Sequence, residues 1–554
     1  MLMANATSGG LLKVTQRLFK ILQLDKKDIS SIYFFAILGG LISLSLPLGI
    51  QTIINFVMAG SISSSIVVLI VIVVFGVFLN GFVQVRQMQI IEKIKQKIFT
   101  RYTLEFAEKL PKLNIEKLDG YYLPELVNRY FDVPALTKSI DKILLDIPTA
   151  VIQILFGLLL LSFYHPIFIG FGALLIIIVL AIIKYTSVRG LETSLEASNY
   201  KYEIAGWLEE MARVIKSFKF SKNTNLHLFK TDDLLSKYLD ARTSHFKILL
   251  LQFWSLISFK IIVTAAMLIV GAILLVDQQI NVGQFIAADI VILTIIGSVE
   301  KLISALDKIY DTLTSLNKLS KVLDSELEQS GSIMLEATKG VTISFNNVTF
   351  RYSEHLVLKN ISFKIQPGQL VCISGASGSG KSSLLRLLTG AFKNFEGNVL
   401  INDVPVANYD LKSLRSQTGI FLNQQDIFNG TLLENLTMGN EEISLQDVTK
   451  ISEKLGLNDF IQSYKNGYDA ILDPLGKRLS ANIKQEILLV RALLGNRSLL
   501  LLENPFNNLD DKEKATLITY LRNEHNATIF ITSEDPKIQD QCDVVLKLEN
   551  GFLI

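Results

Sequence analysis

A glycine-rich segment in the second half of the chain has the residue types and the spacing of a phosphate-binding loop. It reads Gly375-Ala-Ser-Gly-Ser-Gly-Lys-Ser382 and lies between the apolar run Leu370–Ser374 and a helical stretch from Ser383 to Leu388. The spacing G-x-x-x-x-G-K-[ST] binds phosphate when a strand precedes it and a helix follows it, as here. Glycines let backbone N–H groups close around phosphate oxygens, and the helix N-terminus adds a favourable dipole.

The side chains at the end of this loop predict its ligands. Lys381 is expected to reach the β- and γ-phosphates of a nucleotide, and the hydroxyl of Ser382 is expected to bind Mg²⁺. ATP and Mg²⁺ are therefore the predicted cofactors. The predicted nucleotide-binding residues of the loop are Gly375, Ala376, Ser377, Gly378, Ser379, Gly380, Lys381, Ser382 and Ser383.

The segments around this loop alternate between strand and helix patterns. Val341–Phe345 and Thr528–Thr532 are further predicted strands, as expected of an α/β domain. This half of the sequence resembles the nucleotide-binding domain of ABC transporters, and nearly all 554 residues resemble an ABC exporter half-transporter. In that family an aromatic residue ahead of the loop stacks on adenine. Tyr352 stands at that position, and the alternative is a tyrosine that simply lies at a strand edge.

A second family motif, the Q-loop, resembles Phe421-Leu-Asn-Gln-Gln-Asp-Ile-Phe-Asn-Gly-Thr431. The resemblance implies that a glutamine in this stretch senses Mg²⁺. Gln424 is the first choice and Gln425 the second, because the loop is one residue short of the family pattern and the register stays open.

The family's signature motif, L-S-G-G-Q, has lost its glycines in this chain. It reads Leu479-Ser480-Ala481-Asn482-Ile483, with the register fixed by Val490-Arg-Ala-Leu493 downstream. The resemblance implies that Ser480 can still touch a γ-phosphate supplied across a dimer. Without the two glycines, a close approach of backbone to phosphate is harder.

Two residues that act on the γ-phosphate in the family are also replaced. Leu499–Leu502 is followed by Glu503 and Asn504 where the family has Asp and a general-base Glu. Glu503 keeps a carboxylate for the metal, but an amide cannot accept a proton at neutral pH. The strand that should precede a switch histidine ends in Ser533, whose hydroxyl lacks the reach and charge of an imidazole.

These residues therefore predict that the chain binds ATP but hydrolyses it poorly. The residues at catalytic positions are Asn504, Ser533 and Gln424, and the predicted metal-binding residues are Ser382, Gln424 and Glu503. We expect ATP–Mg²⁺ binding with slow or absent hydrolysis at this chain's own loop, because losing a general base typically costs about 10²–10⁴-fold in rate. An obligate heterodimer and a weakly active homodimer are both compatible with these changes. The alternative function is a non-hydrolysing, ATP-gated regulatory or scaffold subunit.

In an exporter of this kind, the nucleotide-binding domain moves membrane-spanning helices, and these are expected in the first half of the chain. Six apolar stretches are predicted to span a membrane: Ile32–Phe56, Ile62–Val85, Ile147–Phe163, Pro166–Ile183, Ile248–Val276 and Val282–Val299. The short loops between paired spans contain no Lys or Arg, whereas the two long connecting segments are rich in both. The positive-inside rule therefore places both termini in the cytoplasm of an inner-membrane, multi-pass protein.

The predicted fold is a multidomain membrane protein with an all-α, six-helix transmembrane domain over residues 1–330 and an α/β P-loop nucleotide-binding domain over 331–554. The net charge of +2 does not point to a nucleic acid partner. Cys372 and Cys542 are distant in sequence and are interpreted as reduced core residues. Leu11–Leu24 is predicted to lie on the inner membrane surface as a helix, with a disordered basic tail as the alternative.

Coupling and cargo are the least constrained by sequence. The helix tips that dock on the ATP-binding domain are predicted near Gly120–Tyr130 and Ala205–Glu210, and ordinary helix-hairpin packing is the alternative. Lys260 and Asp289 lie inside spans, where they can pair or face the substrate path; alternatively, Lys260 reaches the inner interface. Leu46–Ile54 resembles exporters of the toxin and peptide secretion branch, which implies a periplasmic adaptor and an outer-membrane channel as partners. Drug or lipid efflux is the second possibility.

Overall fold

The computed structural model describes residues 8–60, 64–118, 123–222, 224–423, 425–523 and 526–554. It divides into two compact units, and each is described by itself. The first comprises Met1–Leu113 and Gly120–Ser325, and the second comprises Asn114–Asp119 and Glu326–Ile554.

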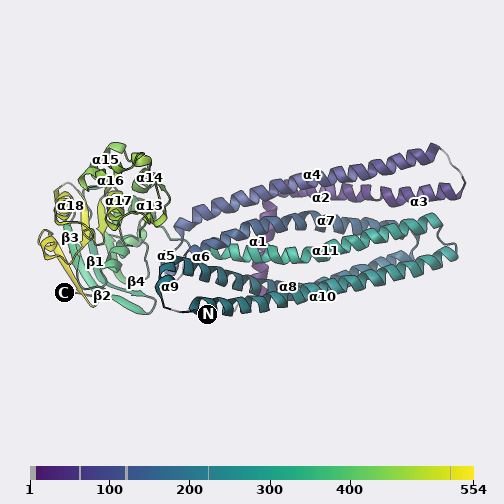
Figure 1. The fold of residues 1–554 in the computed structure, drawn as a ribbon, viewed down its shortest axis with the longest axis horizontal. Coiled ribbons are helices and arrows are strands. Elements are labelled where there is room, and N and C mark those ends of the chain that lie inside the picture. Colours follow the sequence, from purple (N-terminus) through teal and green to yellow (C-terminus); the bar gives the residue numbers. More distant parts are fainter. Residues whose placement is uncertain (1–7, 61–63, 119–122, 223, 424, 524–525) are drawn as a thin grey trace. The chain divides into compact units, whose positions relative to one another are not determined.

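The first unit is a bundle of long helices that run side by side, with the short helix α1 lying across them (Figure 1). Its helices are α1 (Ser8–Leu24), α2 (Lys26–Ser43), α3 (Ser45–Met58), α4 (Ser64–Lys109), α6 (Leu123–Asn128), α7 (Asp132–Tyr164), α8 (Ile167–Arg213), α9 (Ile215–Phe220), α10 (Leu226–Val276) and α11 (Val282–Leu323). Since α1 is helical from Ser8, the alternative of a disordered tail is wrong for this segment. Its predicted place on the membrane surface stays a prediction.

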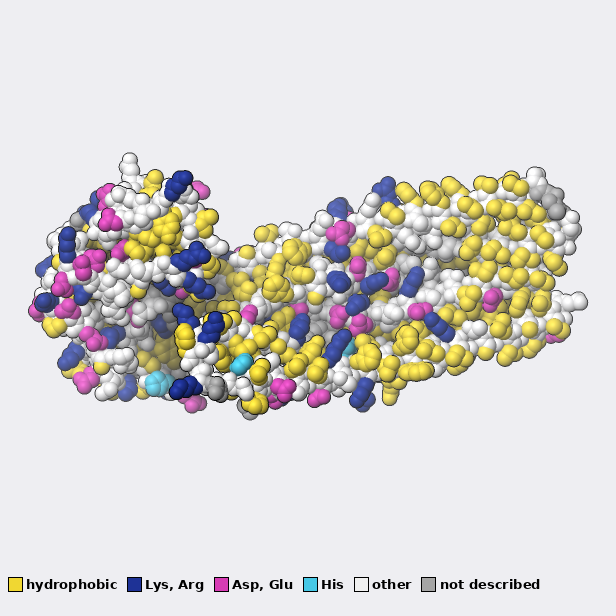
Figure 2. Space-filling view, viewed as in Figure 1, with side chains coloured by type: hydrophobic (Ala, Val, Ile, Leu, Met, Phe, Trp, Pro, Cys, Tyr) yellow, Lys and Arg dark blue, Asp and Glu magenta, His cyan; other side chains and the backbone are white. Residues whose placement is uncertain are grey.

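The helices have the composition required to cross a bilayer. Six helical segments among the described residues are long and apolar enough to do so, which confirms the predicted number of spans. Hydrophobic side chains cover the end of the bundle where α3 approaches α4, and charged side chains gather farther along the helices (Figure 2). The last span begins with a capping box: the Asn281 side chain accepts a hydrogen bond from the Gln284 backbone N–H at 2.8 Å, and the Gln284 side-chain oxygen accepts one from the Asn281 backbone N–H at 2.9 Å.

The charged residues inside the spans do not pair with each other. Lys260 on α10 donates to a carboxylate oxygen of Glu300 on α11 at 2.6 Å, so the alternative in which Lys260 pairs with Asp289 is wrong. Because Glu300 lies one residue beyond the predicted end of the last span, the ion pair belongs near the end of the apolar zone. This favours the interpretation in which the Lys260 amine reaches the interface.

The second helix tip lies away from its predicted position, and the first lies partly outside the described residues. The segment of the first tip that packs into the second unit is Asn114–Asp119, which carries α5 (Ile115–Leu118). Within that unit the Glu116 carboxylate accepts backbone N–H bonds from Lys393 and Asn394, both at 3.2 Å. Part of the predicted tip, residues 119–122, lies outside the described residues.

The second predicted tip is wrong by several residues. Ala205–Glu210 lies inside α8, and the chain turns only after Arg213, through α9 and the residues that precede α10. This turn contains no glycine or proline, but the stretch Ser221-Lys-Asn-Thr-Asn225 is rich in residue types that are common in loops, and it was the local signal for the turn.

The second unit is an α/β domain with two larger sheets. A six-stranded sheet has the order β12-β11-β3-β10-β9-β6, and a four-stranded antiparallel sheet has the order β2-β1-β4-β5. The strands are β1 (Ile343–Tyr352), β2 (His355–Ile365), β3 (Leu370–Ser374), β4 (Phe395–Ile401), β5 (Val404–Pro405), β6 (Thr418–Phe421), β7 (Gly430–Thr431), β8 (Ile471–Leu472), β9 (Leu499–Leu502), β10 (Thr528–Thr532), β11 (Val544–Glu549) and β12 (Phe552–Leu553). The helices are α12 (Lys381–Leu388), α13 (Leu411–Ser416), α14 (Leu432–Thr437), α15 (Leu445–Lys454), α16 (Asn458–Ser463), α17 (Ala481–Leu493), α18 (Asp511–Asn523) and α19 (Pro536–Gln539).

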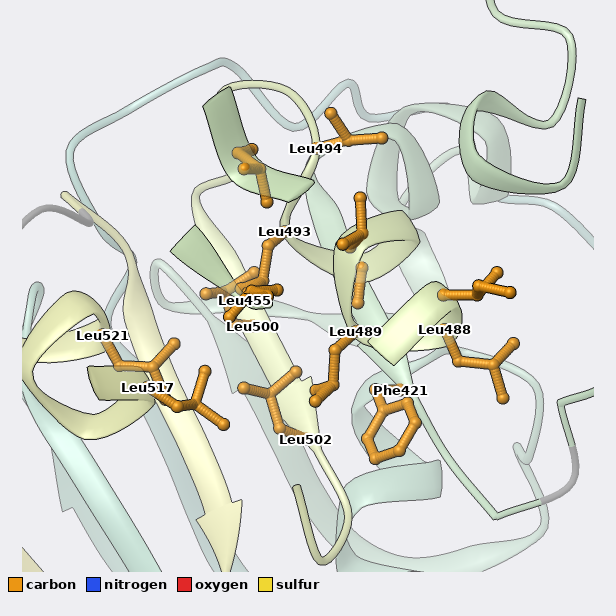
Figure 3. Packing of buried hydrophobic residues seen from close by; sticks show 14 of the residues in the cluster. Phe421, Leu455, Leu488, Leu489, Leu493, Leu494, Leu500, Leu502, Leu517 and Leu521 are labelled. Atoms are coloured by element: carbon orange, nitrogen blue, oxygen red, sulfur yellow. The ribbon is translucent and has the colours of Figure 1, made fainter. Parts of the chain in front are cut away.

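The central strands are parallel and fully buried, which explains why they read as uninterrupted apolar runs. On one side of the sheet, leucines of β9 such as Leu500 and Leu502 pack with Leu489 and Leu493 of α17 and with Phe421 (Figure 3). This packing fixes the carboxyl ends of β3, β9 and β10 next to one another. The loops that leave those ends carry the candidate site.

One buried carboxyl in this core predicts a pH-dependent stability. Glu486 on α17 is 3% exposed, and burial, with the charge of Glu513, raises the pKa of its carboxyl to about 7. An unfolded chain loses this proton near the ordinary value of 4.5, so the folded state loses stability as the pH rises from about 4.5 to 7. Glu486→Gln is expected to stabilise the unit by about 1–3 kcal/mol at pH 8 and by nothing below pH 4.

Unfolding midpoints of the wild type and Glu486→Gln, compared across this pH range, measure the effect. Glu513→Gln is the matched control, because it removes the neighbouring charge and leaves Glu486 in place. A stability difference that stays the same at every pH would show that the proton on Glu486 plays no part.

Candidate nucleotide-binding site

The phosphate loop leaves β3 and enters α12, as predicted, and its glycines are required by the backbone. Gly375 has a φ of 141°, and a Cβ there would lie 2.1 Å from the carbonyl oxygen of Leu548. Gly380, at the start of α12, has a φ of 105°, and a Cβ there would lie 2.6 Å from a methyl group of Leu358. Larger residues are therefore excluded at both positions.

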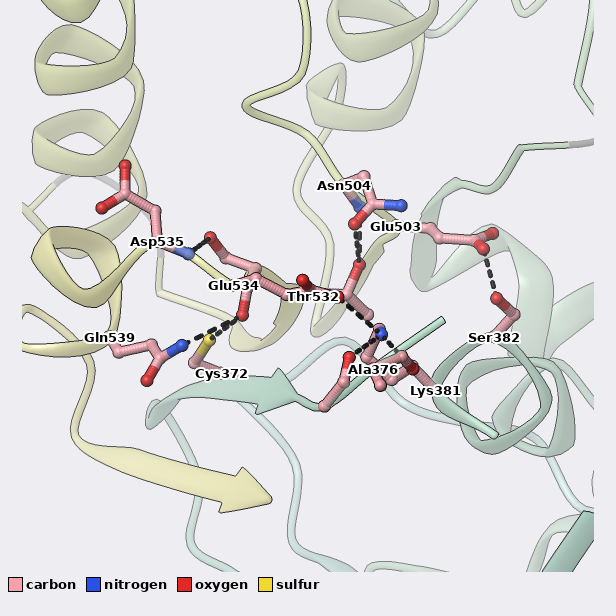
Figure 4. Close-up of polar contacts among 12 residues, drawn as sticks. Cys372, Ala376, Lys381, Ser382, Glu503, Asn504, Thr532, Glu534, Asp535 and Gln539 are labelled. Atoms are coloured by element: carbon pink, nitrogen blue, oxygen red, sulfur yellow. Dashed lines mark hydrogen bonds and ion pairs between the residues drawn. The ribbon is translucent and has the colours of Figure 1, made fainter. Parts of the chain in front are cut away.

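The ammonium of Lys381 lies against its own loop. It donates to the carbonyl oxygens of Gly375 and Ala376, the latter at 3.0 Å, and forms an ion pair with Glu534 at 3.2 Å (Figure 4). The Lys381 side chain is only 12% exposed, whereas that of Glu534 is 65% exposed. The Glu534 carboxylate thus occupies the kind of position on Lys381 that a phosphate oxygen can take.

Ser382 and Glu503 meet in the way expected of a shared metal site. The Ser382 hydroxyl donates to Glu503 Oε1, and Glu503 is 3% exposed. Asn423 completes the set, since its backbone N–H donates to Glu503 Oε2 at 3.0 Å and its Nδ2 donates to Oε1 at 2.8 Å. Every oxygen of this buried carboxylate is hydrogen bonded, as burial requires.

The donor atoms present here fit Mg²⁺ and a triphosphate. Hydroxyl and carboxylate oxygens are the ligands Mg²⁺ takes, and it usually completes its shell with water and substrate phosphates. The hydroxyl of Ser379, in the middle of the loop, is buried and has no hydrogen-bond partner within the described residues. This Ser379 hydroxyl is therefore free to donate a hydrogen bond to a phosphate oxygen of a bound nucleotide. When bound, Mg²⁺ would be held by Ser382 and Glu503 and would neutralise phosphate charge.

Within the described residues, the Q-loop side chain that reaches this site is that of Asn423. Gln424 lies outside the described residues, and the Gln425 side-chain oxygen is buried without a partner in the part of the chain that the structure describes. Asn423 is the amide that touches Glu503. The sequence did contain a signal: if Asn423 is taken as the motif's amide, the loop that looked one residue short has its full length.

Asn504 is held by the end of β10. Its backbone N–H donates to the Thr532 hydroxyl at 2.7 Å, and that hydroxyl donates to the Asn504 side-chain oxygen at 3.0 Å. Asn504 has a φ of 50°, in the left-handed region that asparagine tolerates better than most residues. The side-chain oxygen is thus already engaged, and no group that can take a proton stands at this position.

The similarity of this chain to known proteins follows its two units. Residues 29–299 match the model of the ABC transporter transmembrane region, and residues 358–507 match the ABC transporter model. The chain belongs to the ABC transporters. Each model covers the unit in which the corresponding features lie, the six spans in the first and the phosphate loop in the second.

Individual relatives of this ABC transporter are diverse. A probable ABC transporter ATP-binding/permease protein of Haemophilus influenzae is 31% identical over 51% of the chain and 52% of its own length. An ATP-dependent lipid A-core flippase of Pseudoalteromonas atlantica is 23% identical over 84% of the chain and 79% of its own. An alpha-hemolysin translocation ATP-binding protein of Escherichia coli O157:H7 is 30% identical over 51% of the chain and 40% of its own. The chain thus spans only 52% of the Haemophilus influenzae protein and 40% of the Escherichia coli O157:H7 protein.

A solved structure shares the whole fold. The chain superimposes on a bacterial Atm1-family ABC exporter with ATP bound with a TM-score of 0.85 and 20% identity, covering 95% of this chain and 94% of the other. Because so much of both chains aligns, the helical unit and the ATP-binding unit occur together in the same fold.

Ser533 directly follows β10 in this ABC transporter, and its hydroxyl faces the turn toward Asp535. It accepts a hydrogen bond from the Asp535 backbone N–H at 3.2 Å, and Ser533 is 8% exposed. The side chain that approaches the phosphate loop is its neighbour, Glu534. Sequence reasoning missed Glu534 because no family motif includes a carboxylate there.

Tyr352 lies beside the first turn of α12. Its hydroxyl hydrogen bonds with Arg386 at 3.1 Å and with Ser383 at 3.5 Å, and its ring meets Phe350 and Phe392 edge to face. The ring is half-buried. A stacking role toward adenine remains a prediction, and the geometry places the ring next to the helix that begins at Lys381.

Ser480 caps the signature helix. Its hydroxyl accepts the backbone N–H of Ile483 at 3.2 Å, and the residue is exposed at the start of α17. Gln485, one turn later, donates to the Pro505 carbonyl at 2.7 Å and thereby ties this helix to the segment after Asn504. This hydrogen bond connects α17 to the segment that follows β9 in the same chain.

Proposed function

We propose that this chain is the ATP-binding half of an ABC exporter that moves a substrate out across the inner membrane together with a second half-transporter. The observation that carries the proposal is the phosphate loop, with Lys381 at its mouth and Ser382 on the buried Glu503. The lack of Lys and Arg in the loops between paired spans supports cytoplasmic placement of both termini and of the ATP-binding unit.

Hydrolysis at this chain's own loop is slow or absent in this proposal. Lys381 and the loop N–H groups hold phosphate, and Ser382 and Glu503 hold Mg²⁺. The residue at position 504 then cannot take the proton of an attacking water, because Asn504 is an amide whose oxygen is bonded to Thr532. Ser533 cannot supply a charge to the γ-phosphate, since its hydroxyl is engaged with Asp535.

Dimerisation with a second half-transporter restores ATP hydrolysis at only one of the two composite sites. In the family, each composite site combines the loop of one chain with the signature helix of the other. A partner with an intact base can hydrolyse ATP at its own loop, where it meets Ser480 of this chain with Ala481 and Asn482 in place of glycines. Ser480 is exposed at the helix start, which supports a role across the interface. A heterodimer and a weakly active homodimer both fit this arrangement.

The cargo is assigned only by similarity. The likeness to an alpha-hemolysin translocation protein supports a peptide or protein cargo, with a periplasmic adaptor and an outer-membrane channel as partners. The likeness to a lipid A-core flippase supports the second possibility, lipid or drug efflux.

A second function is favoured by the accumulation of changes around the γ-phosphate. Asn504 and Ser533 both replace residues that the family uses there, and the signature motif has lost its two glycines. A subunit that binds ATP without hydrolysing it can gate or scaffold a catalytic partner. In such a subunit, bound ATP changes the activity of the partner only by favouring the closed state of the dimer.

One measurement separates these functions. We expect the chain, purified alone in lipid, to bind ATP–Mg²⁺ and to hydrolyse it no faster than about 1% of a typical transport ATPase, since general-base loss costs about 10²–10⁴-fold. Co-expression with any half-transporter that is encoded beside it should restore turnover if the chain is a transport subunit. If a Ser480→Ala chain in that pair is as active as the wild type, this chain serves as a scaffold. Vigorous turnover by the chain alone would exclude impaired hydrolysis.

A further inference from the structure

A small polar cavity lies inside the helical unit, in the parts of its helices that extend beyond the predicted spans. Four helices that run side by side, α7, α8, α10 and α11, each contribute to its lining (Figure 1). Its volume is about 220 Å³. Sites for drug-sized ligands measure roughly 300–1,000 Å³, so a cavity of this size suits a smaller molecule.

Asp132, the first residue of α7, places an unsatisfied acceptor in this lining. The residue is 4% exposed, and its Oδ1 lies 3.5 Å from the ammonium of Lys201 on α8. Its Oδ2 is buried and receives no hydrogen bond from any described residue. Burial raises the pKa of this carboxyl, and the charge of Lys201 opposes that shift. Because a buried carboxylate oxygen is costly to leave unsatisfied, a donor inside the cavity would remove that cost.

Hydroxyl groups from α8 also line the cavity. The Ser198 Oγ is buried and lacks a hydrogen-bond partner in the part of the chain that the structure describes. The Ser194 hydroxyl differs, because it already shares a hydrogen bond with the hydroxyl of Thr314 on α11 at 3.0 Å. The unmet acceptors of the lining are therefore Asp132 Oδ2 and Ser198 Oγ, and a ligand with several N–H donors can satisfy both.

Arg242 on α10 supplies an unmatched positive charge. It is exposed and forms no ion pair within the described ranges, whereas the other charged residues of the lining are matched. Lys201 lies against Asp132, and Asp311 accepts a hydrogen bond from Lys308 at 2.9 Å. A guanidinium binds carboxylates through two parallel hydrogen bonds. The cavity thus offers a place for a donor on one set of helices and a place for a carboxylate on another.

We propose that this cavity binds a small zwitterionic α-amino acid, with its ammonium on Asp132 Oδ2 and Ser198 Oγ and its carboxylate on Arg242. The volume leaves space for a short side chain, which selects glycine, L-alanine, L-serine and L-threonine as the candidates. The proposal does not rest on the nucleotide site, because the whole lining belongs to the helical unit and the phosphate loop belongs to the second unit.

Other classes of ligand fit this lining less well. An amine without a carboxylate leaves Arg242 unmatched, and a carboxylate or phosphate without an N–H leaves Asp132 Oδ2 without a donor. A divalent cation needs several oxygen ligands, and no cluster of three or more Asp, Glu, His or Cys side chains occurs among the residues described. A mainly apolar compound would leave the buried polar atoms without partners.

The test measures binding to the full chain in lipid nanodiscs by isothermal titration calorimetry, with each of the four amino acids in turn and without nucleotide. We expect at least one of them to bind with a Kd of about 1 mM or tighter. The matching amine and the matching carboxylate each lack one of the two charged groups (for L-serine they are ethanolamine and 3-hydroxypropionate). Each should bind at least about tenfold more weakly than the amino acid.

Two variants remove the proposed contacts one at a time. Asp132→Asn and Arg242→Gln should each weaken binding about 10- to 100-fold, because each removes a charge-assisted hydrogen bond. Lys237→Gln is the matched control on α10. Lys237 lies outside the lining and pairs with Asp233 at 2.6 Å, so its loss removes a nearby cation and leaves the cavity intact. This control should bind the amino acid like the wild type.

Three outcomes overturn the proposal. They are the absence of binding by all four amino acids, equal binding by the amine or the carboxylate alone, and an equal loss of affinity in Lys237→Gln and Arg242→Gln. Thermal unfolding shows whether each variant is folded. Since Arg242 is exposed, its variant keeps the test decisive if Asp132→Asn does not fold. ATP binding by the same protein is measured separately, so failure of the proposed function and failure of this site are distinguished.

Discussion

Asn504→Glu is expected to raise ATP hydrolysis by the purified chain about 10- to 100-fold. The new carboxylate is one methylene longer than the amide that Thr532 now holds, so it can extend beyond that hydroxyl toward an attacking water. A general base contributes about 10²–10⁴-fold. We expect less than the full range because Ser533 still stands where the family has a histidine.

The backbone limits this gain as well. Asn504 has a φ of 50°, and a residue other than Asn or Gly in the left-handed region costs about 1 kcal/mol or more. Asn504→Gln is the matched control, because it has the same length as Glu and the same strain but no basic oxygen. Steady-state phosphate release in lipid, with ATP binding measured in parallel, compares the two. Equal rates in both variants, with ATP still bound, would show that the missing base does not limit hydrolysis.

The parts of the fold that the sequence predicted are those in which the signal is local. A strand such as Leu370–Ser374 is an unbroken apolar run because both faces of a parallel sheet are covered. The spans are apolar because lipid surrounds them, and the phosphate loop needs glycines at positions that a few neighbouring residues define. The element bounds of β3 and β10 agree with the prediction residue by residue.

The parts that the sequence did not predict are contacts made across long separations. Lys381 and Glu534 are 153 residues apart, and Asn423 and Glu503 are 80 residues apart. Such pairs are set by the order of strands in the sheet, which brings the ends of β3, β6, β9 and β10 together. No property of Glu534 in its own sequence window distinguishes it from any other exposed carboxylate.

The second helix tip failed for a different physical reason. The second tip was predicted at Ala205–Glu210, and α8 in fact continues to Arg213. Where a long helix extends beyond its apolar segment, no membrane boundary fixes where it turns. Packing against other elements decides the position, and that information is not local.

Lys381→Ala is expected to weaken ATP binding about 10- to 100-fold, because it removes a charge-assisted hydrogen bond worth about 1.5–3 kcal/mol. The side chain also bonds the carbonyls of Gly375 and Ala376, so a thermal unfolding curve without nucleotide must show that the loop variant is folded. Equilibrium binding of a fluorescent ATP analogue with Mg²⁺ gives the affinity.

Glu534→Gln is the matched control for this loss, because it removes the partner of Lys381 and leaves the loop intact. An exposed ion pair contributes about 0–1 kcal/mol, so this variant should bind ATP equally well or up to about fivefold more tightly. The two changes thus act in opposite directions on the same ammonium group. If Lys381→Ala kept its affinity, nucleotide would not be held at this loop, and if Glu534→Gln bound much more weakly, the carboxylate would assist nucleotide binding and would not compete with phosphate for Lys381.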